Sequence, residues 1–176
     1  NARGGDLIGF EVDVANRLAE DLGVKAQFVQ ASFPNLLDDL LADRFDIIVT
    51  GMSITPARAL VANFSIPVSE SYARLLANRT KAAGIRTAAG FDRPEVTIAV
   101  RAGAIGEDVA RRSFPKATIQ SFEDEDALIE AVLTGKVTAG VGWSPAPEFL
   151  SAKAGDKLFV PLADPLAKSR EAFAVR

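Results

Sequence analysis

The sequence contains no cysteine and no histidine. Their absence excludes disulfide bridges, thiolate nucleophiles, the usual zinc ligand sets and any Ser-His-Asp triad. Any catalysis would have to use carboxylates, lysines, arginines, hydroxyl groups and a single tyrosine. We therefore expect a protein that is not an enzyme and that uses no metal ion or cofactor.

The sequence also lacks a long apolar run and an excess of positive charge. No stretch approaches the roughly 18 apolar residues of a membrane-spanning helix, so we expect no transmembrane segment in this chain. The formal net charge of −3 has the wrong sign for a nucleic-acid partner. The first residues contain no signal peptide, although a secreted protein whose leader has been removed would look the same.

Helical and strand-like periods alternate along the 176 residues. Helices are expected to begin near residues 11, 34, 55, 106, 121 and 144, and strands are expected over 24–30, 46–50, 72–78, 96–101, 137–143, 158–162 and 171–176. This alternation predicts an α/β fold with mostly parallel sheets. A strand before Gly9 and helices after Arg176 would be needed to complete the first sheet, so we expect the chain to lack them.

Arg58 is the most informative candidate for a binding residue. Thr55 is a preferred N-cap and Pro56 suits the first helical position, which places Arg58 third in a helix whose positive end disfavours a cation. Thr50, Gly51 and Ser53 precede this helix, so amides, hydroxyls and a guanidinium converge at one point. This combination suits a carboxylate. The alternative is a surface arginine lying along its own helix.

A second set of candidates follows the strand over 96–101. Gly103, Ala104 and Ile105 lead into a helix, where backbone amides can approach an anion, although such a turn often only reverses the chain. Trp143 ends a later strand at the carboxyl edge, where α/β proteins bind ligands, and its alternative is an ordinary core aromatic. The acidic run over 123–126 is explained by the helix dipole.

Several segments resemble one family in order along nearly the whole chain. They are Gly9–Ala15, Arg44–Ile48, Gly51–Arg58, Asn63–Pro67, Val100–Gly103, Gly135–Val137 and Phe173–Arg176. Together they resemble the family-3 periplasmic solute-binding proteins, which deliver amino acids to ABC importers.

The resemblance implies a two-lobed clamp of the periplasmic-binding-protein type II. Residues 1–78 would form the first lobe, residues 79–170 the second, and residues 171–176 a strand returning to the first. It implies that Arg58 binds the ligand carboxylate, that Ser53 and Gly51 contact the ligand, and that Phe33 forms an aromatic wall. It further implies a periplasmic or other extracytoplasmic location and the membrane subunits of an importer as partners.

The second lobe departs from the family pattern. Gly103-Ala104-Ile105 stands where the family usually has Gly-Thr-Thr, and Trp143 stands where the family has the aspartate that pairs with the ligand ammonium. An unpaired buried ammonium costs several kcal/mol, of which a tryptophan face recovers about 1–2 kcal/mol. The expected ligand is an amino acid or a related small carboxylate bound between two lobes, and the second lobe disfavours an ordinary α-amino acid.

Two other functions are compatible with this fold. The chain could be the ligand-sensing ectodomain of a receptor or sensor kinase, which flanking transmembrane helices would reveal. It could also be a lyase similar to cyclohexadienyl dehydratase, which removes water from a bound carboxylate and needs a carboxylic acid of raised pKa. Glu107 is the acid nearest the expected site, but its position favours a role in stabilising its own helix.

Overall fold

A computed structural model describes residues 7–176 and divides them into two compact units. Unit 1 comprises residues up to 31, residues 35–68 and residues 171–176, whereas unit 2 comprises residues 32–34 and 69–170. The boundary between lobes that the sequence led us to expect lay between residues 78 and 79. The difference is strand β3 (Ser69–Asn78), which belongs to unit 2 because it pairs with strands β6 and β7 there.

Unit 1 is built around two antiparallel strand pairings with the end of β8 (Ala167–Val175). Its elements are α1 (Phe10–Asp21), α2 (Leu36–Leu41), β1 (Ile47–Ser53), α3 (Pro56–Ala59) and β2 (Asn63–Phe64). The short helix η1 (Phe33–Asn35) precedes α2, and its first two residues group with unit 2. The core contains Leu40, Ile48, Met52, Ala62 and Ala174. Helix α1 buries only Ala19, and a hydrogen bond from Gly51 to Glu11 connects it to β1.

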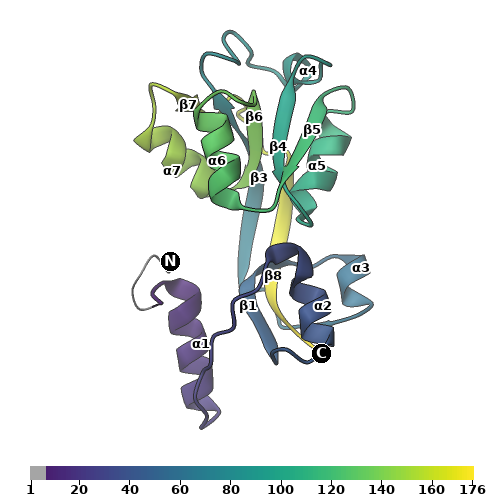
Figure 1. The fold of residues 1–176 in the computed structure, drawn as a ribbon, viewed down its shortest axis with the longest axis vertical. Helices are drawn as coiled ribbons and strands as arrows, with labels where there is room; N and C mark the ends of the chain where they lie inside the picture. The colour runs from purple at the N-terminus through teal and green to yellow at the C-terminus, as the bar shows by residue number, and fades with distance from the viewer. Residues whose placement is uncertain (1–6) are drawn as a thin grey trace. The chain divides into compact units, whose positions relative to one another are not determined.

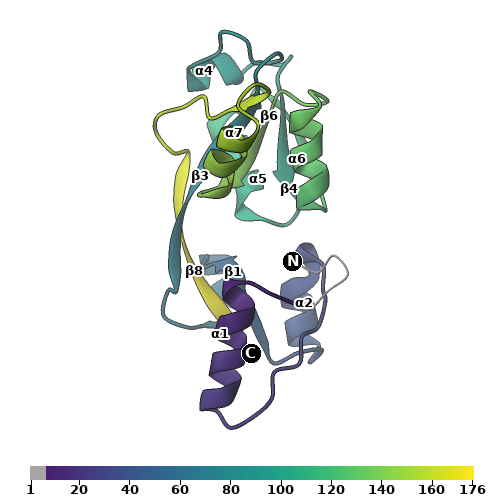
Figure 2. The same cartoon turned by 90° about the vertical axis from the view of Figure 1, so that its left-hand side faces the viewer.

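Unit 2 is a sheet covered by helices on both faces (Figures 1 and 2). Its further elements are α4 (Ala88–Phe91), β4 (Thr97–Arg101), α5 (Ile105–Ser113), β5 (Thr118–Phe122), α6 (Glu125–Leu133), β6 (Ala139–Trp143), α7 (Ala146–Lys153) and β7 (Leu158–Phe159). Along β4, Ile98 and Val100 pack with α5, whereas Ala99 packs with α6. This alternation is the period of two that places successive side chains on opposite faces.

The sheet is mixed, whereas the sequence predicted mostly parallel pairing. Hydrogen-bonded strands follow the order β1-β8-β3-β6-β4-β5, and β4 pairs in parallel with β5 and with β6. Strand β8 pairs antiparallel with β1 and β2, and β3 pairs antiparallel with β6 and β7. The expectation of separate sheets for the two halves is wrong, because β8 pairs with β3 and also with β1.

Three local predictions also need correction. No strand forms between Gly23 and Ser32, because that segment has no partner strand among the described residues, and Val24 and Phe28 are exposed. A strand that was not predicted, β5, occupies Thr118–Phe122. The cap of α6 is therefore Asp124, whose carboxylate accepts hydrogen bonds from two amides of the first turn, and not Ser121.

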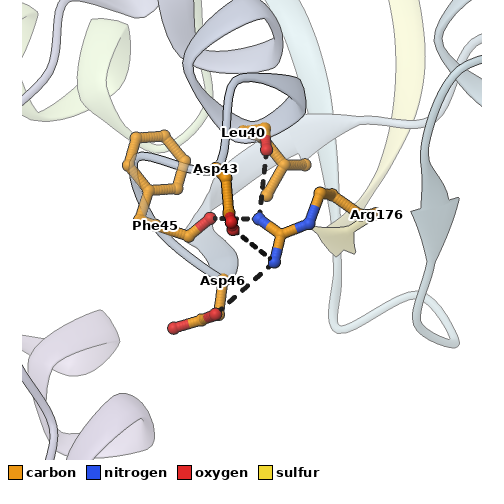
Figure 3. Close-up of polar contacts among 5 residues, drawn as sticks. All are labelled: Leu40, Asp43, Phe45, Asp46 and Arg176. Carbon is orange, nitrogen blue, oxygen red and sulfur yellow. Dashed lines mark hydrogen bonds and ion pairs between the residues drawn. The ribbon is translucent and has the colours of Figure 1, made fainter.

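Unit 1 is closed by Arg176, which joins the end of β8 to the segment after α2 (Figure 3). Its guanidinium donates to the carbonyl oxygens of Leu40 at 3.2 Å and Phe45 at 3.0 Å. It also forms ion pairs with Asp43 at 2.7 Å and Asp46 at 3.6 Å. A cation at a helix C-terminus satisfies carbonyl groups that lack partners in the helix and opposes the helix dipole.

Candidate functional site

In unit 1, the guanidinium of Arg58 turns back from α3 toward the end of β1. Its Nη1 donates a 3.0 Å hydrogen bond to the carbonyl oxygen of Ser53, and the side chain is partly buried. The predicted cap is present, because the hydroxyl of Thr55 accepts from the backbone N–H of Arg58 at 3.2 Å and Pro56 begins the helix. Thus the four residues of α3 hold a guanidinium beside the buried Ser53.

The end of β1 is irregular where the other candidates lie. Ile48 and Met52 are four positions apart in β1, but their partners Ala174 and Ala172 are only two positions apart in β8. Such a bulge removes backbone groups from the regular ladder and is frequent beside binding sites. Thr50 and Gly51 lie within it.

Gly51 is confined between two carboxylates of unit 1. Its backbone N–H donates to Oε1 of Glu11 at 3.0 Å. A β-carbon at this position would lie 3.0 Å from a carboxylate oxygen of Glu171, so a larger residue here would require the Glu171 side chain to shift. A ligand carboxylate at the Gly51 amide would therefore compete with Glu11, a residue that the sequence patterns did not indicate.

In unit 2, the ring of Phe33 lies under Arg101, with the guanidinium carbon 4.4 Å from the ring centroid. The resemblance placed Phe33 in the first lobe, but residues 32–34 group with unit 2 because of this stack and the neighbouring packing of Pro34. Gly103 has φ +70°, and a β-carbon on it would lie 3.0 Å from Cα of Pro34. Glycine is therefore required by both conformation and space.

The other second-lobe candidates surround the start of α5. Ala104 is the N-cap residue and provides no side-chain cap, and Ile105 begins the helix. A β-carbon on Gly106 would lie 3.7 Å from Nε1 of Trp143, so the indole nitrogen lies close to this first turn. The indole is partly buried and also packs against the main core of unit 2. Trp143 thus combines core packing with a donor near α5.

The acidic groups near these residues differ in their surroundings. Glu107 accepts from Arg111, one turn along α5, at 2.8 Å, which confirms its role in its own helix. Glu125, in the acidic run that we assigned to the helix dipole alone, lies 3.9 Å from Arg101. Burial raises the pKa of Glu125, while the charge of Arg101 opposes that shift.

Comparison with known protein families identifies the class to which this chain belongs. Residues 1–134 match the bacterial extracellular solute-binding proteins, family 3. The chain belongs to this family, as its sequence motifs predicted.

Individual proteins of known name are also similar to this chain. The chain is 38% identical over 132 residues to cyclohexadienyl dehydratase of Pseudomonas aeruginosa, a match that covers 75% of the chain and 49% of that enzyme. It thus spans about half the length of this relative.

Two solved structures have the same fold. The ancestral amino acid-binding protein AncCDT-1, a precursor of cyclohexadienyl dehydratase, has a TM-score of 0.88 at 31% identity and covers 99% of this chain and 74% of its own. A putative binding component of an ABC transporter from Wolinella succinogenes, complexed with lysine, has a TM-score of 0.89 at 30% identity, covering 99% and 75%. The predicted α/β fold of periplasmic-binding-protein type II is thereby confirmed.

Proposed function

We propose that the chain is the ligand-binding part of an extracytoplasmic solute-binding protein that delivers a small carboxylate to an ABC importer. The compound would be an amino acid or a related organic acid. The observation that carries the proposal is the Arg58 guanidinium, which hydrogen-bonds to the end of β1 beside the buried Ser53. A planar guanidinium suits bidentate recognition of a carboxylate.

The local structure of unit 1 supports this role for Arg58. Helix α3 has four residues, so Arg58 stands in its only turn, which Thr55 and Pro56 cap. This turn holds the guanidinium next to the end of β1. The bulge in β1 places further backbone donors next to the same strand end. No helix within residues 7–176 is long and apolar enough to cross a membrane.

The test is a thermal-shift screen of the chain with amino acids and small carboxylates, followed by titration calorimetry. A ligand at 100 times its dissociation constant adds about 2.7 kcal/mol to the free energy of unfolding. Arg58→Ala should weaken the binding by about 2–5 kcal/mol, as expected when one partner of a buried charged pair is removed. Arg44→Ala, which removes an exposed arginine of unit 1, is the matched control. Equal affinity of both variants would contradict the proposal.

A second candidate function is a lyase acting on a bound carboxylate. It is favoured by the similarity to a cyclohexadienyl dehydratase and by Glu125, whose raised pKa suits proton donation. We rank it below binding because the relatives also include solute-binding proteins such as the lysine complex. Incubation with cyclohexadienyl carboxylates, followed by chromatography of the products, tests it. Formation of a dehydrated product by the native chain, but not by the Glu125→Gln variant, would favour the lyase.

A further inference from the structure

Unit 2 contains a small polar pocket at one edge of its sheet. The pocket has a volume of about 220 Å³ and lies where β4 begins at Thr97 and where Thr138 precedes β6. Because β4 and β6 are parallel, this is the amino-terminal edge of both strands, whereas Arg101 and Trp143 end them. Four residue steps along β4, or about 13 Å, separate the two edges. The volume is below the roughly 300–1,000 Å³ of pockets for drug-sized ligands, which favours a small ion or group.

The lining of this pocket carries an excess of positive charge. Lys81, Arg93 and Lys136 contribute three cations, and Glu95 contributes one acid. Lys81 follows β3, Arg93 and Glu95 precede β4, and Lys136 precedes β6. Among the described residues, none of the three cations forms an ion pair. Since the whole chain has a formal net charge of −3, its composition does not account for this concentration of cations.

Two arginines from the same region are engaged by other groups. The guanidinium carbons of Arg79 and Arg86 lie 5.2 Å and 4.6 Å from the ring centroid of Phe159. Each guanidinium also donates to a backbone carbonyl oxygen, that of Gly155 for Arg79 and that of Ile85 for Arg86. The three cations of the pocket differ from these arginines, because like charges at one pocket repel one another until an anion binds.

Lys81 and Lys136 are held near one another by a buried asparagine. Nδ2 of Asn78 donates to the carbonyl oxygen of Val132 in α6 at 3.0 Å, and its Oδ1 accepts from the backbone N–H of Lys81 at 3.0 Å. A β-carbon on Gly135 would lie 3.4 Å from Cγ of Lys81, and Lys136 is the next residue. The backbone that carries both lysines is therefore in place before any ion binds.

Thr138 adds a neutral donor to the pocket. It is buried, and its hydroxyl oxygen accepts from the backbone N–H of Thr97 at 3.3 Å, which leaves the hydroxyl proton to donate. Donors from several segments can reach different oxygens of one ion. A phosphate group offers three acceptor oxygens and carries a charge of about −1.5 to −2 at pH 7. That charge matches the excess of two positive charges in the lining.

We propose that this pocket is a second binding site of unit 2 and that it binds a phosphate group. Lys81, Arg93 and Lys136 contact its oxygens, and the hydroxyl of Thr138 donates to one of them. Free inorganic phosphate and a phosphate monoester present the same dianionic oxygens, so either can supply the group. All lining residues belong to unit 2, and the site is therefore independent of the role proposed for Arg58.

Titration calorimetry of the 176-residue chain at constant ionic strength tests the proposal. The probes are inorganic phosphate, glycerol 3-phosphate and sulfate, with chloride as the control anion. Phosphate should bind and chloride should not. Between about pH 7 and about pH 5 phosphate loses most of its second charge, so its affinity should fall by up to about tenfold. Sulfate keeps both charges and reports any change in the protein itself, such as protonation of Glu95.

Charge variants identify the groups that hold the ion. Lys81→Gln and Lys136→Gln should each weaken phosphate binding by about threefold and together by about tenfold, the range for exposed charge pairs. Glu95→Gln should strengthen binding by about two- to threefold because it removes a like charge, an effect that misfolding cannot produce. Lys153→Gln removes an exposed lysine of α7 that does not line the pocket and should change nothing. Circular dichroism checks that each variant is folded.

The outcomes are distinct. Weaker binding in both lysine variants, with tighter binding in Glu95→Gln, supports the proposal. In that case, equal affinities for glycerol 3-phosphate and phosphate identify a group carried by a larger molecule, whereas binding of phosphate alone identifies the free ion. The proposal is wrong if phosphate binds no better than chloride. It is also wrong if Lys153→Gln weakens binding as much as Lys136→Gln, because the attraction would then come from the surface charge in general.

Discussion

The backbone N–H of Gly51 donates a 3.0 Å hydrogen bond to the carboxylate of Glu11, forty residues earlier in the chain. This bond places a negative charge at the bulge of β1, where the sequence had predicted contact with a ligand. Glu11 therefore occupies a donor that an incoming carboxylate would use.

Glu11→Gln should strengthen carboxylate binding. A neutral amide oxygen holds the Gly51 N–H less strongly than a carboxylate does, and the substitution removes a repulsive charge. We expect a gain of about two- to fivefold in affinity by calorimetry, corresponding to about 0.5–1 kcal/mol. Glu20→Gln, an exposed acid on the same helix, should change nothing. A loss of affinity in Glu11→Gln would mean that Glu11 organises the site.

Thr55→Ala should reduce both stability and carboxylate binding. The cap hydroxyl holds the first turn of a four-residue helix that carries Arg58, and its loss costs about 1 kcal/mol. Thr87→Ala is a close control, because Thr87 caps the four-residue α4 with the same 3.2 Å bond. Urea denaturation should show similar losses for the two variants, but only Thr55→Ala should weaken binding. Equal ligand affinities of Thr55→Ala and Thr87→Ala would show that the cap of α3 does not contribute to binding.

The raised pKa of Glu125 predicts a specific pH dependence. Because the folded state holds this proton more tightly than the unfolded state, stability declines as the pH rises from the ordinary glutamate value of 4.5 through the raised folded pKa. Glu125→Gln should flatten the decline in that window, as measured by thermal unfolding from about pH 4 to about pH 8. Arg101→Gln should instead raise the pKa of Glu125 further, which carboxyl NMR titration can follow. An unchanged pKa would show that the two charges do not interact.

Gly103→Ala should destabilise unit 2, whereas Gly106→Ala should be tolerated. A non-glycine residue at φ +70° costs about 1–2 kcal/mol, and the new methyl group would press on the backbone of Pro34. Gly106 lies in a helix, and a β-carbon added there would lie 3.5 Å and 3.7 Å from its nearest neighbours, which is ordinary contact. Chemical denaturation measures both effects. Equal stability of the two alanine variants would show that the loop can rearrange freely.

Sequence alone predicted features that depend on local chemistry. The Thr55-Pro56 start of α3 follows from capping, and the strand predicted over 96–101 is observed as β4. Strand β5 was missed because it is short and only two of its five residues, Ile119 and Phe122, are apolar. Residues 24–30 have strand propensity, but a strand also needs a partner, which propensity cannot supply.

The stack of Arg101 on Phe33 could not be predicted because it joins residues that are far apart in the chain. The motif after β4 was recognised for its glycines, and Arg101 was interpreted only as part of that motif. The signal that could have identified Arg101 is an arginine that ends a buried strand beside the start of a helix. A comparable position, between a strand and a helix start, indicated Arg58. Glu125 was hidden by its acidic neighbours, because sequence does not reveal which member of such a run is buried.

The pairing of β1 with the end of β8 also sets the order in which the chain can fold. Ser53 lies opposite Glu171, so about 120 residues are synthesised between these partners, or about 6–24 s at the usual rate of translation. Unit 2 is nearly continuous in sequence and emerges from the ribosome complete before residues 171–176. β1 therefore waits for a partner that is synthesised after unit 2, and the two strands pair by a long-range contact of the kind that slows folding.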